Sequence, residues 1–307
     1  MFNVKRGEIY LYDFGKEIGS IQGGKRPVVI LQSDDFNMYF PTVVVAAITS
    51  VIKKTNLSSH VVLKEKYGLM YPSMILLEQM ITIKKSALEK YIGAIDDRNI
   101  LELIDKGIRK TLDIYYPYKN LRKGNNFDSS SVMRGELYLY DFGYEKGLAL
   151  NGVRPVVVLQ NDAINRKSPT TVVFSVSNAK RTYLPSQIFI KQNYGLEMFS
   201  VINLNQIAVV NQFSLQKKIG EINSKKIQGE IYRGLKMVFG LYNKPKLDDK
   251  GDWMCLCQKC LKSIMWGDDA IVKRADPFQK YKDRCIKCDG FGFDYIISRR
   301  NGGVHNG

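Results

Sequence analysis

The most constraining feature of this sequence is an internal repeat. Arg6–Thr49 aligns without a gap with Arg134–Ser177 at a constant offset of 128, and 24 of the 44 aligned positions are identical. Such a repeat predicts two copies of one domain, and a length of 307 residues leaves room for a further small one. We expect domains at residues 1–117, 132–242 and 253–300, joined by polar linkers at 118–131 and 243–252.

The charge balance indicates a polyanionic partner. The chain carries 46 Lys+Arg against 30 Asp+Glu, a formal net charge of +16, which favours nucleic acid over a neutral ligand. The alternative is a surface that is charged only for solubility. The first residues lack the apolar stretch of a signal peptide, and the longest apolar run, Val43–Ile48, is too short to span a bilayer. We therefore expect a soluble, cytoplasmic protein with no membrane contact.

Each copy is predicted to be a small, mainly β (α+β) domain closed by a C-terminal helix. Short runs rich in β-branched residues indicate strands. In copy one they are Glu8–Phe14, Arg26–Gln32, Thr42–Ile48, His60–Lys64 and Met74–Met80. After Asp96, a candidate helix cap, apolar residues recur at helical spacing: Ile100, Leu103, Ile104, Ile108 and Leu112.

Copy two repeats this order of elements. Its predicted strands are Gly135–Phe142, Arg154–Gln160, Thr170–Val176, Ser186–Lys191 and Phe199–Val210, and its helix runs from about Ser224 to Leu241.

Four ordered segments of copy one resemble the MazF/PemK family of toxin endoribonucleases: Arg6–Tyr10, Gly19–Val28, Pro41–Thr49 and Leu76–Gln79. The resemblance covers nearly all of copy one and is weaker in copy two. It implies a barrel of the SH3-like, plasmid-maintenance-toxin type that cleaves single-stranded RNA without a metal cofactor. It also implies that protomers pair and that a protein antitoxin inhibits them.

The chemistry that the resemblance implies needs few groups. When the 2′-hydroxyl of RNA is the nucleophile, the protein must align it with the leaving 5′-oxygen and neutralise charge on the transition state. Arg26 offers a permanent cation with a fork of donors that fits phosphate oxygens. Thr49 offers a hydroxyl at a strand end, and both residues match the family's catalytic positions. Considered alone, an Arg before Pro is usually a surface residue, and a strand Thr usually serves strand propensity.

Further residues are candidates for RNA contact. Lys53 and Lys54 follow the Thr49 strand and can hold backbone phosphates, although an ordinary solvated loop is the alternative. The resemblance adds Ser20, Gln22 and Gly24 in a turn expected to fold over RNA, together with Gln79. Copy one has a single histidine, His60, so it cannot assemble a two-histidine ribonuclease mechanism.

The second copy keeps the reactive groups and loses the turn. Arg154 and Ser177 replace Arg26 and Thr49, whereas Ser20 and Gln22 become Leu148 and Leu150. We expect the two copies to pair as an intrachain pseudo-dimer in which copy one cuts and copy two supports the RNA groove. Further self-association stays open.

The cysteines are confined to the last quarter of the chain. Cys257 and Cys260 form one C-x-x-C pair, and Cys285 and Cys288 form another. Four thiolates in two tight turns are typical of structural zinc, which a domain this short needs in place of a large core. Redox-active or unpaired thiols are the alternative. The sequence also leaves open a second class of function, a non-catalytic nucleic-acid-binding protein that grips with duplicated barrels and a zinc module.

Overall fold

The computed structural model describes residues 4–16, 19–64, 67–114, 132–143, 150–179, 184, 186–190, 194–241, 252–265, 270–274, 282–285, 287–288 and 290–299. The chain divides into two compact units, Met1–Gly240 and Leu241–Gly307. The predicted linker at 118–131 and residues 243–251 of the second linker lie outside the described residues. Asp252, assigned to that linker, begins a strand instead.

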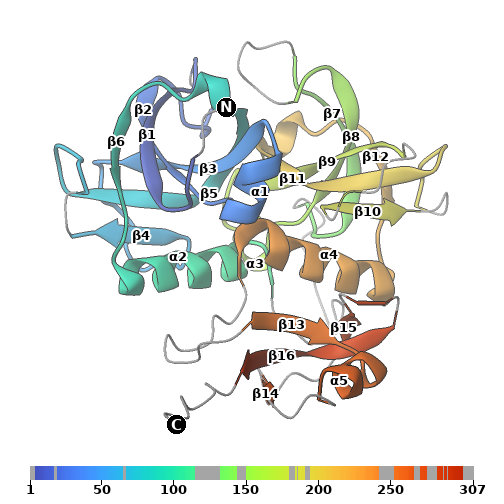
Figure 1. Ribbon diagram of the computed structural model, residues 1–307. Coiled ribbons are helices and arrows are strands. Elements are labelled where there is room, and N and C mark those ends of the chain that lie inside the picture. Colours follow the sequence, from blue (N-terminus) through green and yellow to red (C-terminus); the bar gives the residue numbers. More distant parts are fainter. Residues whose placement is uncertain are drawn as a thin grey trace, which may run out of the picture. The chain divides into compact units, whose positions relative to one another are not determined.

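Copy one forms a six-stranded antiparallel sheet that curls into a half-barrel (Figure 1). The spatial order is β4-β5-β3-β2-β1-β6. The strands are β1 (Glu8–Asp13), β2 (Lys25–Ile30), β3 (Thr42–Thr49), β4 (His60–Leu63), β5 (Ser73–Lys84) and β6 (Tyr91–Ala94). The helical elements are α1 (Asp34–Tyr39), the 3-10 turn η1 (Lys85–Ala87) and α2 (Arg98–Thr111). A bulge in β5, between the partners of Ala46 and Ala47, bends this long strand.

Copy two repeats the sheet in the equivalent order, β10-β11-β9-β8-β7-β12. Its strands are β7 (Glu136–Asp141), β8 (Val153–Val158), β9 (Thr170–Asn178), β10 (Gln187–Ile190), β11 (Ser200–Asn211) and β12 (Lys218–Glu221). Its helical elements are α3 (Asp162–Asn165), η2 (Gln212–Ser214) and α4 (Lys225–Phe239). The expected mainly β fold, in two tandem copies, is confirmed.

The predicted helices differ from the observed ones in detail. Asp97, not Asp96, caps α2, because its carboxylate accepts the backbone N–H of Asn99. Ile104 and Ile108 are buried as expected, but Leu103 is 46% exposed and lies off the buried face. Helix α4 ends at Phe239, where Gly240 adopts a left-handed conformation (φ 61°).

The two copies pack against each other within one unit. Strands β5 and β11 contact one another, and equivalent residues make reciprocal backbone bonds. The Ser33 N–H donates to the Val238 carbonyl, and the Asn161 N–H donates to the Thr111 carbonyl, both at 2.8 Å. The N-terminal end of α1 or α3 in each copy thus receives the end of the other copy's last helix. Such reciprocity is the mark of a two-fold-like pair.

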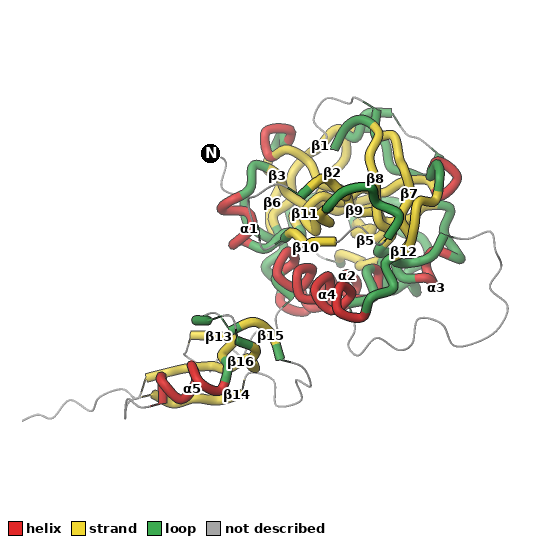
Figure 2. Tube along the Cα trace, turned by 90° about the vertical axis from the view of Figure 1, so that its right-hand side faces the viewer, coloured by secondary structure: helices red, strands yellow, loops and turns green. Residues whose placement is uncertain are grey.

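The C-terminal unit has its own small antiparallel sheet (Figure 2). β13 (Asp252–Leu256) and β14 (Ala270–Arg274) pair with opposite edges of β16 (Phe291–Arg299), and the short β15 (Asp283–Arg284) also pairs with β16. Helix α5 (Gln258–Met265) begins within the first C-x-x-C segment and contains Cys260. Among the helices described in either unit, none is both long enough and apolar enough to cross a membrane.

Candidate active site

Arg26 and Thr49 lie on neighbouring strands. In the pairing of β2 with β3, Val28 lies opposite Ala47. Arg26 lies two residues before Val28 on β2, and Thr49 lies two residues after Ala47 on β3. The predicted cation and the predicted hydroxyl are therefore on neighbouring antiparallel strands, at the same end of the strand pair.

The guanidinium of Arg26 is held by its own turn. Its Nε donates to the Gly23 carbonyl at 2.9 Å, NH2 donates to the same oxygen, and NH1 donates to Gln22 Oε1. Each terminal nitrogen carries a second N–H, so the group keeps donors for an anion. The partly buried cation is therefore fixed in orientation before any ligand arrives.

The turn itself is tied to the sheet by Gln79. The Gln79 side chain is buried, accepts the Gln22 N–H at 3.4 Å and donates to the Ser20 carbonyl at 3.3 Å. Gly24 has a φ of 72° and closes the hairpin through a 2.7 Å bond from its N–H to the Gly15 carbonyl. Four of the residues predicted to contact RNA, Ser20, Gln22, Gly24 and Gln79, thus gather around Arg26. Gln79 lies beneath the turn, not on its surface.

The Thr49 hydroxyl begins the loop that carries the two predicted lysines. Thr49 Oγ1 accepts the Val51 N–H at 3.1 Å, which leaves the hydroxyl proton to be donated. Lys53 and Lys54 are exposed in this loop, and Lys54 has a φ of 50°. Their side chains can reach an anion that approaches from solvent.

His60 anchors the same loop to the sheet. Its Nδ1 lies 3.1 Å from the Lys53 carbonyl oxygen, and its Nε2 lies 2.8 Å from Glu78 Oε1. Burial of the ring opposes the charged form. The hydrogen bond and negative charge of Glu78, with the carbonyls of Lys53 and Lys54, outweigh it and raise the pKa of His60 above 6.5. Two acceptors around one ring favour the imidazolium, and through these contacts His60 holds the lysine loop against the sheet.

The second copy has the same backbone and different side-chain partners. Arg154 lies two residues before Val156 on β8, and Ser177 lies two residues after Ser175 on β9, at the same end of this strand pair. Arg154 Nε still donates to a turn carbonyl, that of Asn151, at 2.9 Å. The position of Gln22, however, is taken by the buried Leu150. The second guanidinium is held instead by the side-chain amide of Asn151, whose Oδ1 accepts from Arg154 NH2 at 3.2 Å.

The hydroxyl of the second copy is engaged by a side-chain amide. Asn203 Nδ2 donates to Ser177 Oγ at 3.0 Å and to Ser175 Oγ at 3.3 Å, and Asn203 Oδ1 accepts from Gln187 at 3.2 Å. Ser175 in turn donates to Gln206, the equivalent of Gln79, at 2.6 Å. In copy one, Leu76 and Ala47 occupy the positions of Asn203 and Ser175, so the described residues form no such network around Thr49.

The four predicted cysteines converge in the C-terminal unit. The Sγ atoms of Cys257, Cys260, Cys285 and Cys288 all lie within 4.8 Å of one another. Tetrahedral zinc with Zn–S bonds of about 2.3 Å needs S···S separations of about 3.8 Å. Backbone N–H groups point at two of the sulfurs, from Cys260 to Cys257 and from Gly290 to Cys288, both at 3.4 Å. These four residues can bind a metal ion.

A glycine completes this cysteine cluster. A Cβ at Gly290 would lie 3.3 Å from Cys288 Sγ and 3.3 Å from Cys257 Cβ, so a larger residue would crowd the sulfurs. Burial raises the pKa of the Cys285 thiol. Nearby backbone hydrogen bonds and the Cys260 thiol outweigh that effect and lower it to about 6, which favours the thiolate that metals bind. Cys255 is buried on β13 outside the cluster.

Sequence inspection missed several residues that shape the site. Asn203 and the Glu78–His60 contact depend on the register of long, bulged strands, which no local pattern reveals. The sequence alignment of the two copies showed that Gln22 corresponds to Leu150, but it did not show that Gln22 bonds to Arg26. Tyr12, opposite Arg26 in the β1–β2 pairing, showed only the alternation of a half-buried strand.

Fold and site together define a tandem, mainly β protein whose first repeat carries a held, partly buried arginine and a threonine hydroxyl on neighbouring strands. The chain belongs to the family described as "PemK-like, MazF-like toxin of type II toxin-antitoxin system", which matches residues 5–112 and 133–239. The resemblance seen in the sequence is confirmed, and both copies are members.

Individual relatives match about one copy each. The chain is 43% identical over 110 residues to "Endoribonuclease EndoA" of Bacillus subtilis, covering 36% of this chain and 94% of that protein. It is 40% identical over 126 residues to "Endoribonuclease MazF" of Staphylococcus epidermidis, covering 41% and 96%. Among solved structures, one titled "Endoribonuclease in complex with its cognate antitoxin from Mycobacterial species" matches at 23% identity and a TM-score of 0.32, covering 36% of this chain and 98% of that one.

Proposed function

We propose that this chain is a metal-independent endoribonuclease that cleaves single-stranded RNA by attack of the RNA's own 2′-hydroxyl. The observation that supports the proposal is that the held guanidinium of Arg26 and the residue Thr49 lie at the same end of the neighbouring strands β2 and β3. Endoribonuclease relatives in the same family support the reaction class. The products are a cyclic phosphate, or the 3′-phosphate that follows from it, and a 5′-hydroxyl.

Arg26 and Thr49 have different roles in the transition state. As the 2′-oxygen bonds to phosphorus and the bond to the 5′-oxygen breaks, negative charge collects on the phosphoryl oxygens. Arg26 neutralises that charge, and its preset orientation avoids reorganisation during the reaction. The Thr49 hydroxyl donates to the phosphate or orients the attacking 2′-hydroxyl. The 2′-hydroxyl loses its proton as it attacks, and the leaving 5′-oxygen gains one, for which Arg26 is a candidate donor.

The remaining RNA contacts come from both copies. In copy one we assign them to Ser20, Gln22, Gly24, Lys53, Lys54 and Gln79, with Gln79 acting through the turn. Copy two contributes charge: residues 132–241 hold 14 Lys+Arg against 7 Asp+Glu, whereas residues 1–114 hold 16 against 13. Since charge supplies most sequence-independent affinity for nucleic acid, the second copy is better suited to RNA binding than to RNA cleavage.

Family membership also suggests the biological setting. We infer that the chain is a toxin acting in the cytoplasm and neutralised by a protein antitoxin, with its two barrels serving as the pair that other members form from two chains. The proposed domains are residues 1–117, 132–242 and 253–300. The cysteine cluster is assigned structural zinc, and the reaction itself is assigned no metal.

A ribonuclease assay in EDTA tests the proposal. We expect purified protein to cut a long single-stranded RNA at defined sites in EDTA, giving 5′-hydroxyl ends that polynucleotide kinase labels directly. Because EDTA removes zinc from the tail, a shortened chain ending at Tyr242 runs beside it and should cut at the same sites. Cleavage that stops in EDTA for both chains and returns with Mg²⁺ would overturn the mechanism.

The competing function is nucleic-acid binding without catalysis. The altered site of copy two favours it for that half of the molecule, because Leu150 and Asn203 replace the groups around Arg26 and Thr49. If the full chain shifts a labelled RNA in a gel but leaves it intact over hours, binding without cleavage is the function of the whole protein.

A further inference from the structure

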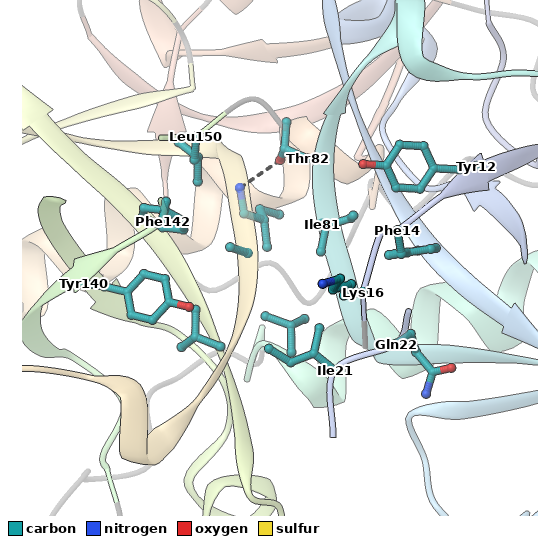
Figure 3. Close-up of a pocket in the computed structure, with 14 residues that line it drawn as sticks. Tyr12, Phe14, Lys16, Ile21, Gln22, Ile81, Thr82, Tyr140, Phe142 and Leu150 are labelled. Carbon is teal, nitrogen blue, oxygen red and sulfur yellow. Dashed lines mark hydrogen bonds between the residues drawn. The ribbon is translucent and has the colours of Figure 1, made fainter. Parts of the chain in front are cut away.

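The turn of copy one that holds Arg26, Gly19–Gly24, faces the second copy. Ile21 and Gln22 of this turn line a pocket of about 130 Å³ together with residues 207–210 of β11 (Figure 3). Aromatic side chains of both copies also line this pocket: Tyr12, Phe14, Tyr140 and Phe142. The turn that orients the arginine of copy one thus lies beside a strand of copy two.

A direct contact joins the two copies at the start of this turn. Gly19 has a φ of 61°, and a Cβ placed on it would lie 3.1 Å from both Nδ2 and Oδ1 of Asn211. The side-chain amide of Asn211, the last residue of β11, therefore lies close against Gly19. Asn211 is only 1% exposed, so its side chain has little room to move away.

The end of β11 that carries Asn211 is anchored within copy two. Asn211 lies opposite Thr170 in the pairing of β11 with β9. The next residue, Gln212, donates from its side chain to the carbonyls of Asn165 and Ser168 at 2.7 Å and 2.8 Å. The support beside Gly19 therefore belongs to the framework of the second copy.

The equivalent position of copy one carries a different residue. Lys84 ends β5 as Asn211 ends β11, and each lies opposite the first threonine of the neighbouring strand, Thr42 or Thr170. Lys84 is exposed, whereas Asn211 is buried. Two identical barrels would present the same residue at both positions. This chain instead supplies a buried amide beside the turn that holds Arg26.

We propose that Asn211 is a positioning residue for cleavage in copy one, because it fixes the start of the Gly19–Gly24 turn and thereby the orientation of the Arg26 guanidinium. The inference rests on the proposed ribonuclease function. Gln79 holds the turn from within copy one, and Gln22 connects the turn to Arg26. Since a misplacement of about 1 Å can lower a rate about 100-fold, a contact from the other copy can control the reaction.

A double-mutant cycle in the full chain tests this contact. Gly19→Ala places a methyl group against the Asn211 amide, and Asn211→Ala removes that amide. We expect Gly19→Ala to lower the single-turnover cleavage rate at saturating RNA. In the Asn211→Ala background its effect should be smaller by roughly 2- to 150-fold, the range of coupling between residues in contact. If the two losses multiply as independent effects, Asn211 does not position the turn.

Two matched controls separate the contact from other effects. Gly143 has the same φ of 61°, and no described atom lies within 4 Å of a Cβ placed on it, so Gly143→Ala introduces the backbone strain without the contact. Lys84→Ala repeats the Asn211 substitution at the equivalent position of copy one. Gly19→Ala should lower the rate more than Gly143→Ala does. Because Gly19 is exposed, this comparison holds even if Asn211→Ala destabilises the fold.

A binding measurement separates positioning from RNA affinity. An oligoribonucleotide with one 2′-deoxy residue at the cut lacks the nucleophile, so it binds without being cleaved. Because charge supplies most of the affinity, its Kd should change by less than about 3-fold in Gly19→Ala and Asn211→Ala.

Three outcomes would overturn the inference. If the Kd weakens as much as the rate falls, or if Gly19→Ala matches Gly143→Ala in rate, the contact does not position Arg26. The same conclusion follows if Asn211→Ala cleaves as fast as Lys84→Ala. If the wild-type chain cleaves no RNA at all, the ribonuclease proposal itself fails, and the inference with it.

Discussion

A partly buried arginine can stabilise a transition state only if its orientation is fixed beforehand. In copy one, the Gly23 carbonyl and the Gln22 amide fix it, and Gln79 fixes Gln22 in turn. In copy two, Asn151 holds Arg154 through both its carbonyl and its side-chain amide oxygen, Leu150 replaces Gln22, and the Ser177 hydroxyl accepts a hydrogen bond from Asn203. The two copies therefore act as an internal comparison: they share the reactive groups and differ in the residues that position them.

His60 gives the site a pH dependence of defined sign. Its folded-state pKa lies above 6.5, so its pairing with Glu78 stabilises the fold fully at pH below 6.5. That contribution is lost as pH rises through the raised folded-state pKa. We expect His60→Gln, which introduces the residue of copy two, to lower the free energy of unfolding most near about pH 5.5 and progressively less at higher pH.

Urea unfolding at several pH values measures this effect. Glu78→Gln is the matched control, since it removes the partner's charge and should flatten the pH dependence in the same way. A deficit for His60→Gln that stays constant or grows as the pH rises contradicts the assignment of His60 as protonated.

Among the elements, β5 and β11 form the contact on which pairing of the two copies depends. The buried Thr82 hydroxyl on β5 donates to the Asn205 carbonyl at 3.0 Å and accepts the Ile207 N–H at 2.8 Å. The equivalent residue in copy two is Val209, so this pair of bonds exists once. The bulge of β11 that exposes these two backbone groups makes the contact directional.

Replacing Thr82 with valine removes this contact while keeping the shape of the side chain. The carbonyl and N–H of β11 would then be buried without partners, at a cost of about 1–3 kcal/mol. We expect Thr82→Val to lower the free energy of unfolding by that amount, with Thr42→Val on the partly exposed start of β3 as the control. Equal unfolding midpoints in urea for Thr82→Val and wild type would show that the hydroxyl does not hold the copies together.

The sequence predicted the elements best where one local pattern decides them. The β-branched runs at Arg26–Gln32 and Thr42–Ile48 become β2 and β3 with ends shifted by one or two residues. The strands β6 and β12 and the one- to two-turn helices α1 and α3 were missed, because they are too short to show a period. The cap was assigned to Asp96 rather than Asp97, because two adjacent acidic residues carry the same signal and backbone geometry selects between them.

For the site, contacts between segments that are distant in the sequence limit how much could be predicted. Strand order makes the strands of Arg26 and Thr49 neighbours, and both residues had been named from motifs. The amide clamp from Gln22, the Asn203 network and the aromatic pocket each join segments whose pairing depends on bulges and on the packing of two copies. Local sequence patterns therefore do not predict which of these segments pair.

At the level of the whole molecule, duplication within one chain allows two halves to specialise. Two separate identical protomers must carry the same residues on both sides of their interface. Here the tether holds unlike halves together at an effective concentration of roughly millimolar. One half holds its arginine through Gln22 and Gln79, and the other carries more of the excess positive charge. The central claim is therefore asymmetry: one cutting site and one supporting half.

Single-turnover cleavage of one RNA by Arg26→Ala and by Arg154→Ala tests this claim most directly, because the two substitutions are chemically identical and lie at equivalent positions. We expect Arg26→Ala to abolish cleavage and Arg154→Ala to retain at least a tenth of the wild-type rate, a loss of no more than about 1.4 kcal/mol in transition-state stabilisation. Equal losses in the two variants, with both still folded, would contradict the account.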